Sequence, residues 1–494
     1  MTESLTGADS SLDAGGYLVE PDVAGRVIAA ALQRGGDFAE IFAEDRYGTT
    51  AFLDDGRVEE LATGRVRGAG VRVVVGETTG YAHTSDLTQA GLMAAAEAAS
   101  AIARSSVGAV RGVAVGPGPL QGGSREAGGS EPTVPRSAPA LLHPLQVAKA
   151  KKVELLWRAD DAARSAGAEV VQVSAGYADS VRQMLVANSE GLFVGDYTVR
   201  TRLSASVVAL GDGGMQTGYE TIALTRGFEV FEDHDVAELA STAARRALAK
   251  LSARPAPSGE VPVVLASGSG GILFHEACGH GLEADHIAKD ASVFVGRIGE
   301  LVASPLVTLV DDGTLGGEWG SLGVDDEGRS GARNVLIENG VLTDYMWDLI
   351  RARKEGRSSS GNGRRESYRH LPMVRMTNTF LMDGEQEPEE ILADTPHGVY
   401  VAKLGGGQVD TTTGDFVFGT TEAYLIENGE ITEPLRDANL IGNGPEVLSR
   451  VDAVAGDFSM TPGTCGKDGQ SVPVGCGQPT LRVSSVTIGG TAGA

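Results

Sequence analysis

One short segment of the chain combines the residue types of a hydrolytic metal centre. It reads His275-Glu276-Ala277-Cys278-Gly279-His280, so two imidazoles flank a carboxylate and a thiol. The familiar H-E-x-x-H arrangement places its two histidines on one face of a helix. Here they stand at i and i+5, about 140° apart on a regular α-helix. We therefore expect the helix to widen or to end between them, with Gly279 as the residue that permits this.

The residues before this motif predict that it follows a strand. Val261–Leu265 is apolar and strand-like, Ser267–Gly271 is rich in glycine, and the apolar Ile272–Phe274 leads into His275. The glycine-rich run lacks the G-K-[ST] ending of a phosphate-binding loop, which argues against a nucleotide site. A helix that starts at the carboxyl end of a strand opens a crevice in which ligands commonly bind.

Three cysteines are available as a further metal ligand. A hydrolytic zinc ion usually takes three protein ligands and keeps a fourth position for water. Cys278 lies inside the motif, whereas Cys465 and Cys476 lie in glycine-rich segments near the C-terminus. Spacing alone does not choose among the three thiols.

The motif and its surroundings resemble the TldD/PmbA family of metallopeptidases, specifically its TldD-type members. His275–Asp285 (HEACGHGLEAD) is similar to the family's signature. Other segments resemble the family in the same order along the chain: Asp37–Phe42, Gly70–Val74, Gly80–His83, Asp311–Thr314, Asp325–Gly328, Gly361–Tyr368, Arg375–Thr379, Gly407–Asp410 and Gly463–Lys467.

The resemblance implies a role for each residue of the site. In the family, the two motif histidines and the cysteine of a G-T-C-G-K segment bind the metal, and the motif glutamate is the base. The matching residues are His275, His280 and Cys465 as ligands of Zn²⁺, with Glu276 as the catalytic residue. Two neutral imidazoles and one thiolate leave a net charge of about +1, which brings bound water toward a pKa of about 7.

The two remaining cysteines are expected to be structural. Cys278 and Cys476 fall where the family pattern tolerates apolar residues, so we interpret both as small buried side chains. The PmbA-type partner subunits lack the metal motif. Its presence here therefore indicates a catalytic subunit.

The resemblance implies a zinc-dependent peptidase that hydrolyses unfolded or extended peptides. Glu276 takes a proton from the metal-activated water and passes it to the leaving amine. Family members are dimers, so we expect a homodimer or a heterodimer with a PmbA/TldE-type subunit. They accept peptides as an added strand at a sheet edge.

Two other functions remain open. One is a specialised amide hydrolase or processing enzyme of natural-product biosynthesis, and the other is a non-catalytic peptide-binding partner subunit. The intact Glu276 argues against the non-catalytic subunit.

The composition restricts the class of protein. The 494 residues include 66 acidic and 41 basic side chains, a formal charge of −25, so no nucleic-acid partner is expected. Three cysteines are no disulfide framework, and a cysteine ligand has to remain a free thiol. The N-terminal residues are polar, and no apolar run reaches about 18 residues. These features favour a cytoplasmic location without a membrane partner.

The pattern of elements predicts an α+β fold with two domains, since one core stops growing at about 250–300 residues. Residues 1–252 form an N-terminal α+β domain of helices and a sheet, in which 116–144 is a disordered loop rich in Gly, Pro and Ser. The Pro-rich residues 253–259 are a linker. Residues 260–494 form a mainly antiparallel β metallopeptidase domain that carries the motif helix.

Within the first domain, helices are expected over 22–32, 87–103, 144–166 and 235–251. Asp235 is the predicted N-cap of the last, with Glu238 completing a capping box. Strands are expected over 38–61, with a turn at Asp55-Gly56, and over 170–210. In the second domain, Asn339-Gly340 and Asn428-Gly429 predict hairpin turns.

One further segment contains groups that could contact a substrate. Arg364, Arg365 and His370 could hold substrate carbonyls or the oxyanion of the tetrahedral intermediate. The alternative, that the arginines pair with carboxylates for structural reasons, is at least as good.

Overall fold

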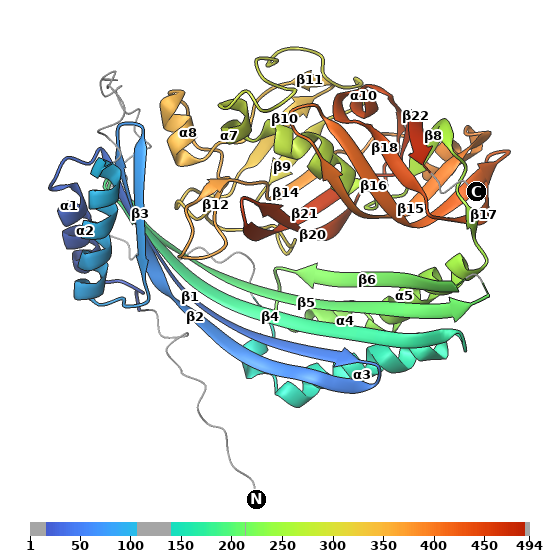
Figure 1. Cartoon of the computed structure of the whole chain (residues 1–494), viewed down its shortest axis with the longest axis horizontal. Coiled ribbons are helices and arrows are strands. Elements are labelled where there is room, and N and C mark those ends of the chain that lie inside the picture. The colour runs from blue at the N-terminus through green and yellow to red at the C-terminus, as the bar shows by residue number, and fades with distance from the viewer. Residues whose placement is uncertain (1–15, 106–139, 213, 490–494) are drawn as a thin grey trace, which may run out of the picture.

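The computed structural model describes residues 16–105, 140–212 and 214–489. They form an α+β protein in which a long curved sheet lies against a compact, strand-rich C-terminal half (Figure 1). The predicted fold class is therefore confirmed. Of the predicted loop over 116–144, residues 116–139 lie outside the described residues.

The long sheet is antiparallel throughout and has the strand order β3-β2-β1-β4-β5-β6. Its first turn is the predicted one, because Asp55 and Gly56 have φ angles of 45° and 72°, in the left-handed region of a tight hairpin. The second strand runs well past the predicted end at residue 61. The strands are β1 (Phe38–Asp54), β2 (Arg57–Val75), β3 (Thr78–Thr84), β4 (Val170–Asn188), β5 (Phe193–Gly211) and β6 (Gly214–Leu224).

Helices cover one face of this sheet in two groups, each with its own apolar core. The first group, α1 and α2, packs on β1–β3. In the second group, α3 and α5 pack on each other and on the outer half of the sheet. All four predicted helices are present, and the apolar stripe of α5 is buried. They are α1 (Pro21–Leu32), α2 (Gln89–Ser105), α3 (Lys149–Ser165) and α5 (Val236–Leu251), accompanied by a 3₁₀ turn at Pro144–Gln146 and the short α4 (Val230–Asp233).

One local prediction was wrong. Asp235 does cap α5, accepting a hydrogen bond from the N–H of Ala237, but Glu238 bonds Thr242 and Arg245 instead of completing a capping box. The side chain of Glu238 therefore points along the helix, where an arginine competes for it. Within the predicted linker, the short strand β7 (Arg254–Pro255) pairs with β17 (Glu430–Arg436).

The C-terminal half consists of two larger sheets around one large apolar core. Both predicted Asn-Gly turns are present, since each asparagine and glycine has a positive φ. The first sheet has the order β11-β10-β9-β14-β21-β20, with β9 (Leu309–Asp312), β10 (Arg333–Glu338), β11 (Val341–Leu342), β14 (Asn378–Leu381), β20 (Ser459–Lys467) and β21 (Gln470–Gln478).

The second sheet contains β7 and β17 together with β8 (Gly259–Leu265), β15 (His397–Val409), β16 (Asp415–Glu427), β18 (Asn439–Asn443), β19 (Val451–Val454) and β22 (Leu481–Gly489). Short elements complete this half: β12 (Gly363–Arg364), β13 (Met373–Val374), α6 (Gly271–Phe274), α7 (Ala284–Ile287), α8 (Leu349–Lys354), α9 (Pro388–Ala393) and α10 (Gly444–Ser449). The residues that follow α6 contact β14 of one sheet and β15 and β16 of the other. The motif helix therefore lies where both sheets support it.

Buried ion pairs join the long sheet to the C-terminal half. Glu40 on β1 accepts from Arg365 at 2.7 Å and from Arg72 on β2 at 2.7 Å, and Arg72 also reaches Glu327 at 2.8 Å. All four side chains are buried.

None of the helices in the described ranges has the length and apolar character of a membrane-spanning helix.

Candidate metal centre

The motif helix is irregular at the position that the spacing of the histidines predicts. His275–Gly279 forms one π-helical turn, in which the N–H of His280 donates to the carbonyl of His275, five residues earlier. A 3₁₀ turn over His280–Leu282 follows directly. The extra residue in the turn brings the two imidazoles to one side of the helix, with ring centroids 5.1 Å apart. The predicted departure from a regular α-helix is confirmed.

Gly279 is required for close packing rather than for an unusual backbone angle. Its φ and ψ of −54° and −51° are ordinary helical values. A Cβ added at Gly279 would lie 2.1 Å from the Sδ atom of Met376, the residue two positions before β14. The glycine therefore lets the metal-motif helix approach the strand beside it.

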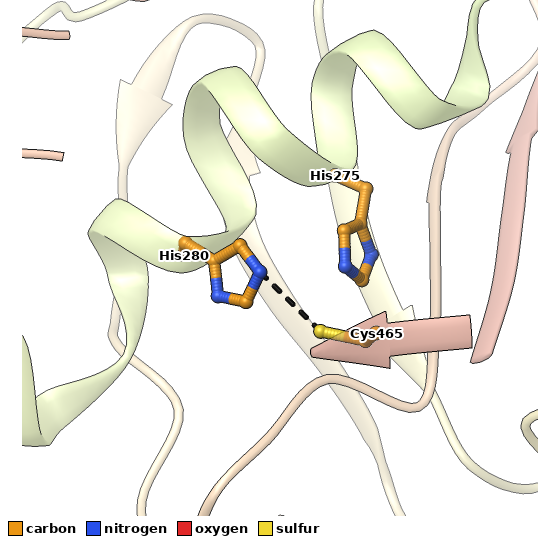
Figure 2. Close-up of side chains that lie close together, drawn as sticks. All are labelled: His275, His280 and Cys465. Atoms are coloured by element: carbon orange, nitrogen blue, oxygen red, sulfur yellow. Dashed lines mark hydrogen bonds between the residues drawn. The ribbon is translucent and has the colours of Figure 1, made fainter. Parts of the chain in front are cut away.

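Three of the predicted side chains converge. The donor atoms of His275, His280 and Cys465 all lie within 4.8 Å of one another, and all three residues are buried. The histidines come from the π turn, and Cys465 reaches them from β20, with its Sγ 3.3 Å from Nε2 of His280 (Figure 2). Residues 185 positions apart in the sequence thus share one small space.

The other two thiols differ from Cys465 in position. Cys278 is fully buried in the main apolar core of the C-terminal half, and burial raises the pKa of its thiol. Cys476 on β21 is also buried, near His275 but outside the set of converging donor atoms. Neither sulfur therefore competes geometrically with that of Cys465.

The chemistry of the three groups fits a metal ion. Both ring nitrogens of His275 are buried without a hydrogen-bond partner among the described residues, although buried polar atoms are nearly always partnered. Burial alone would raise the pKa of Cys465, but the imidazoles of His275 and His280 lower it to about 4. The sulfur is therefore a thiolate at neutral pH, which is the form that binds zinc.

His280 has a partner on the side of its ring away from Cys465. Its Nδ1 lies 2.9 Å from Oε2 of Glu283, which in turn accepts from the ammonium of Lys467 at 2.8 Å. Burial alone would lower the pKa of His280, but Glu283 and Cys465 raise it to about 10. Sequence reasoning did not assign these two residues. Their positions three residues after His280 and two after Cys465 were the available signal.

Glu276 lies at the edge of the cluster. Its Oε2 is 3.7 Å from Nε2 of His280, and its side chain is 23% exposed, whereas the converging donor residues are almost fully enclosed. A carboxylate in this position is close to the donor atoms and still reachable from outside.

The structure gives the Arg364–His370 segment a mainly structural environment. Arg365 pairs with Glu40, as the structural alternative expects. Arg364 instead donates to the backbone carbonyls of Met376 and Pro473. His370 lies against the hydroxyl of Ser367, 3.0 Å from its Nδ1. None of the three belongs to the converging set of donor atoms.

Comparison with known protein families decides the relationship. Three models of PmbA/TldA metallopeptidases match in order: domain 1 at residues 39–103, the central domain at 142–251 and the C-terminal domain at 258–490. The chain belongs to the TldD/PmbA family of metallopeptidases. The last of these matches contains every residue of the cluster.

Curated relatives agree with this assignment. The chain is 42% identical over 463 residues to the Metalloprotease TldD homolog of Haemophilus influenzae, covering 92% of this chain and 93% of that protein. It is 32% identical over 289 residues to the Zinc metalloprotease TldD homolog of Saccharolobus solfataricus, covering 58% and 64% of the two chains. The protein is therefore a metallopeptidase.

Solved structures share the fold at low sequence identity. TldE from Thermococcus kodakarensis superposes with a TM-score of 0.74 at 20% identity, over 95% of this chain and all of that one. A putative modulator of a DNA gyrase from Thermotoga maritima gives a TM-score of 0.75 at 22% identity, over 95% and 99% of the two chains. These likenesses concern the fold alone.

Proposed function

We propose that this metallopeptidase depends on zinc, which His275, His280 and Cys465 hold, and that it cleaves extended peptides with Glu276 as the base. The convergence of two imidazoles and a thiolate within 4.8 Å supports this most directly. Two nitrogens and a sulfur are a donor set that suits zinc and leaves a fourth position open. When bound, zinc supplies a water of lowered pKa and polarises the scissile carbonyl.

Glu276 is placed to move the proton in this reaction. It neighbours a ligand in sequence, its carboxylate lies 3.7 Å from His280, and its partial exposure lets a substrate reach it. The carboxylate accepts the proton of the attacking water and then gives it to the leaving amine. Glu276 is not one of the proposed ligands, so zinc with two neutral imidazoles and one thiolate has a net charge of about +1.

The position of Cys465 favours an extended substrate. Its strand β20 is the last in its sheet, so within the described part of the chain one edge of β20 has no strand paired to it. A peptide that pairs with this edge runs directly past the thiolate. A folded protein cannot offer such a free strand, which accounts for a preference for unfolded peptides. We further propose that the protein acts as a dimer, with a second copy or with a TldE-type subunit.

The ligand set is tested by comparing three cysteine variants. Cys465→Ala should lose its zinc, whereas Cys278→Ala and Cys476→Ala should keep close to one zinc per chain, because only Cys465 faces both imidazoles. Metal content is measured by inductively coupled plasma mass spectrometry after gel filtration, with circular dichroism to verify folding. Retention of zinc by a folded Cys465→Ala protein would refute the proposed centre.

A further inference from the structure

We propose that Glu283 and Lys467 are positioning residues of the metal centre, which fix His280 so that its Nε2 faces the ion. This inference rests on the proposed zinc site. It assigns a role to two charged side chains that touch neither the reacting atoms nor the ion.

Glu283 determines which nitrogen of His280 is free. Its Oε2 lies 2.9 Å from Nδ1, and because a carboxylate only accepts, Nδ1 donates to it, so Nε2, which faces Cys465, is the nitrogen available to an ion. The 3₁₀ turn at His280–Leu282 sets this geometry, since the N–H of Glu283 donates to the carbonyl of His280. Glu283 is fully buried, so water does not replace it.

Lys467 holds Glu283 in place. Its ammonium lies 2.8 Å from Glu283, 2.7 Å from Asp285 and 3.1 Å from the carbonyl of Val374, so all three of its hydrogens have acceptors. Lys467 follows Cys465 by two residues on β20, and alternate residues of a strand point to the same face. One strand therefore supplies both the thiolate and the cation that holds the partner of the second histidine.

The contacts form a closed circuit. His280 and Glu283 come from the end of the motif helix, Cys465 and Lys467 come from β20, and each pair contacts the other. A shift of β20 along the helix would break both contacts together. The circuit therefore keeps the helix and the strand in the register that a small ion requires. Mutation of residues that hydrogen-bond metal ligands commonly weakens metal affinity by about 10–100-fold.

A second metal at this place is excluded by the same lysine. Oxygen or nitrogen atoms of Glu283, Asp285 and His286 lie within 4.8 Å of one another, as donors around an ion would. The ammonium of Lys467 already lies between the two carboxylates, at 2.7–2.8 Å from each. The ammonium of Lys467 therefore neutralises the two carboxylates and would repel a metal ion added there.

The inference is tested by zinc affinity in isosteric variants. Glu283→Gln keeps the size of the side chain but loses the charge that attracts Lys467 and orients His280. Competition with a zinc chelator should show affinity about 10–100-fold weaker than wild type. In the cobalt-substituted protein, the d–d bands should shift, because the imidazole is no longer held in one orientation. Lys467→Met should also weaken zinc binding, and the double variant should lose less than the sum of the two.

A matched control separates this role from general destabilisation. Asp179→Asn, in the long sheet, weakens a buried pair with Lys152 outside this network, so its zinc affinity and cobalt spectrum should stay close to wild type. Unfolding of the chelator-treated proteins, followed by circular dichroism, reports the stability of each variant without metal. Wild-type zinc affinity and an unchanged cobalt spectrum in folded Glu283→Gln would overturn the inference. If Cys465→Ala still loses its metal in that case, the zinc centre stands and only the positioning role fails.

Discussion

His275 is buried without a hydrogen-bond partner among the described residues, and Cys465 is buried as a thiolate beside two imidazoles. An imidazole with two unbonded nitrogens costs free energy in a protein interior, and a buried thiolate does so unless a cation compensates it. Metal binding removes both costs. The site is therefore a place where the fold is less stable in the absence of its ion, and zinc should stabilise the protein by mass action.

Glu276→Gln separates metal binding from catalysis. The amide keeps the shape of the side chain but cannot accept a proton, so we expect full zinc content and turnover reduced by about 10² or more. Peptide hydrolysis and zinc content are measured on the same preparation. Glu427→Gln, a change at an exposed glutamate remote from the cluster, is the control and should behave as wild type. Near-normal turnover of the zinc-loaded Glu276→Gln protein would rule out the glutamate as the base.

The sequence alone could identify the motif residues but not the partners that complete them. The i, i+5 spacing of His275 and His280 predicted a distorted helix because it follows from helix geometry. The choice of Cys465 over Cys278 came only from the family resemblance. The contact of Glu283 with Lys467 joins segments 184 residues apart, and no local pattern predicts which strand lies beside a helix.

Met376 packs directly against the π turn at Gly279. Met376 lies where a side chain at position 279 would extend, so Gly279→Ala forces the sulfur atom or the helix to move. We expect a loss of about 1–3 kcal/mol in the free energy of unfolding, as for other overpacked cores, together with weaker zinc binding. Chemical denaturation and chelator competition measure the two effects.

Another helical glycine provides the comparison. Gly25 in α1 has open space around the position of its Cβ, so Gly25→Ala should leave zinc binding unchanged and raise stability by up to about 1 kcal/mol. In Gly279→Ala combined with Met376→Ala, the clash is removed and zinc affinity should recover. Persistent loss of affinity in that double variant would mean that the glycine acts through backbone freedom instead.

Most elements were predictable because their signals are local. The Asp55-Gly56 and Asn-Gly turns need positive φ angles that these residues tolerate, and the apolar stripe of α5 has a helical period. The ends of the elements depend on distant contacts instead. β2 continues to Val75 because β1 pairs with it as far as Val74 and β3 pairs with Val75 itself. Glu238 leaves its capping position because Arg245 attracts it.

Buried charges connect the two halves of the molecule. Besides the pairs of Glu40 and Arg72, Arg182 on β4 bridges Glu44 at 2.9 Å and Asp326 at 2.8 Å. Segments 325–327 and 363–368 thus extend from the metal-bearing half onto the long sheet. Removing one partner of such a pair leaves a buried charge uncompensated, so these contacts hold the halves in one relative position.

Glu327, one of the buried residues between the two halves, should make the free energy of unfolding depend on pH. Burial raises the pKa of Glu327 to about 8, against the lowering effect of Arg72 and with the help of Asp348 and Glu40. In the unfolded chain this group titrates near 4.3. Between about pH 4.5 and pH 8 the folded protein therefore holds a proton on Glu327 that the unfolded chain releases, and in this range Glu40 carries the charge that balances Arg72. The contribution of Glu327 to stability is fully present below pH 4.5 and is lost as the pH rises through 8.

Glu327→Gln should remove this dependence, because the amide can still accept the hydrogen bond from the N–H of Leu349 but does not titrate. Urea unfolding of the zinc-loaded proteins at pH 5.5, 7 and 8.5 measures the difference. Wild type should lose up to about 1.4 kcal/mol per pH unit relative to the variant over this range. Glu433→Gln, which alters an exposed pair with Arg254, should follow wild type at every pH. Parallel curves for wild type and Glu327→Gln would show instead that Glu327 is ionised in the folded protein and that Arg72 outweighs its burial.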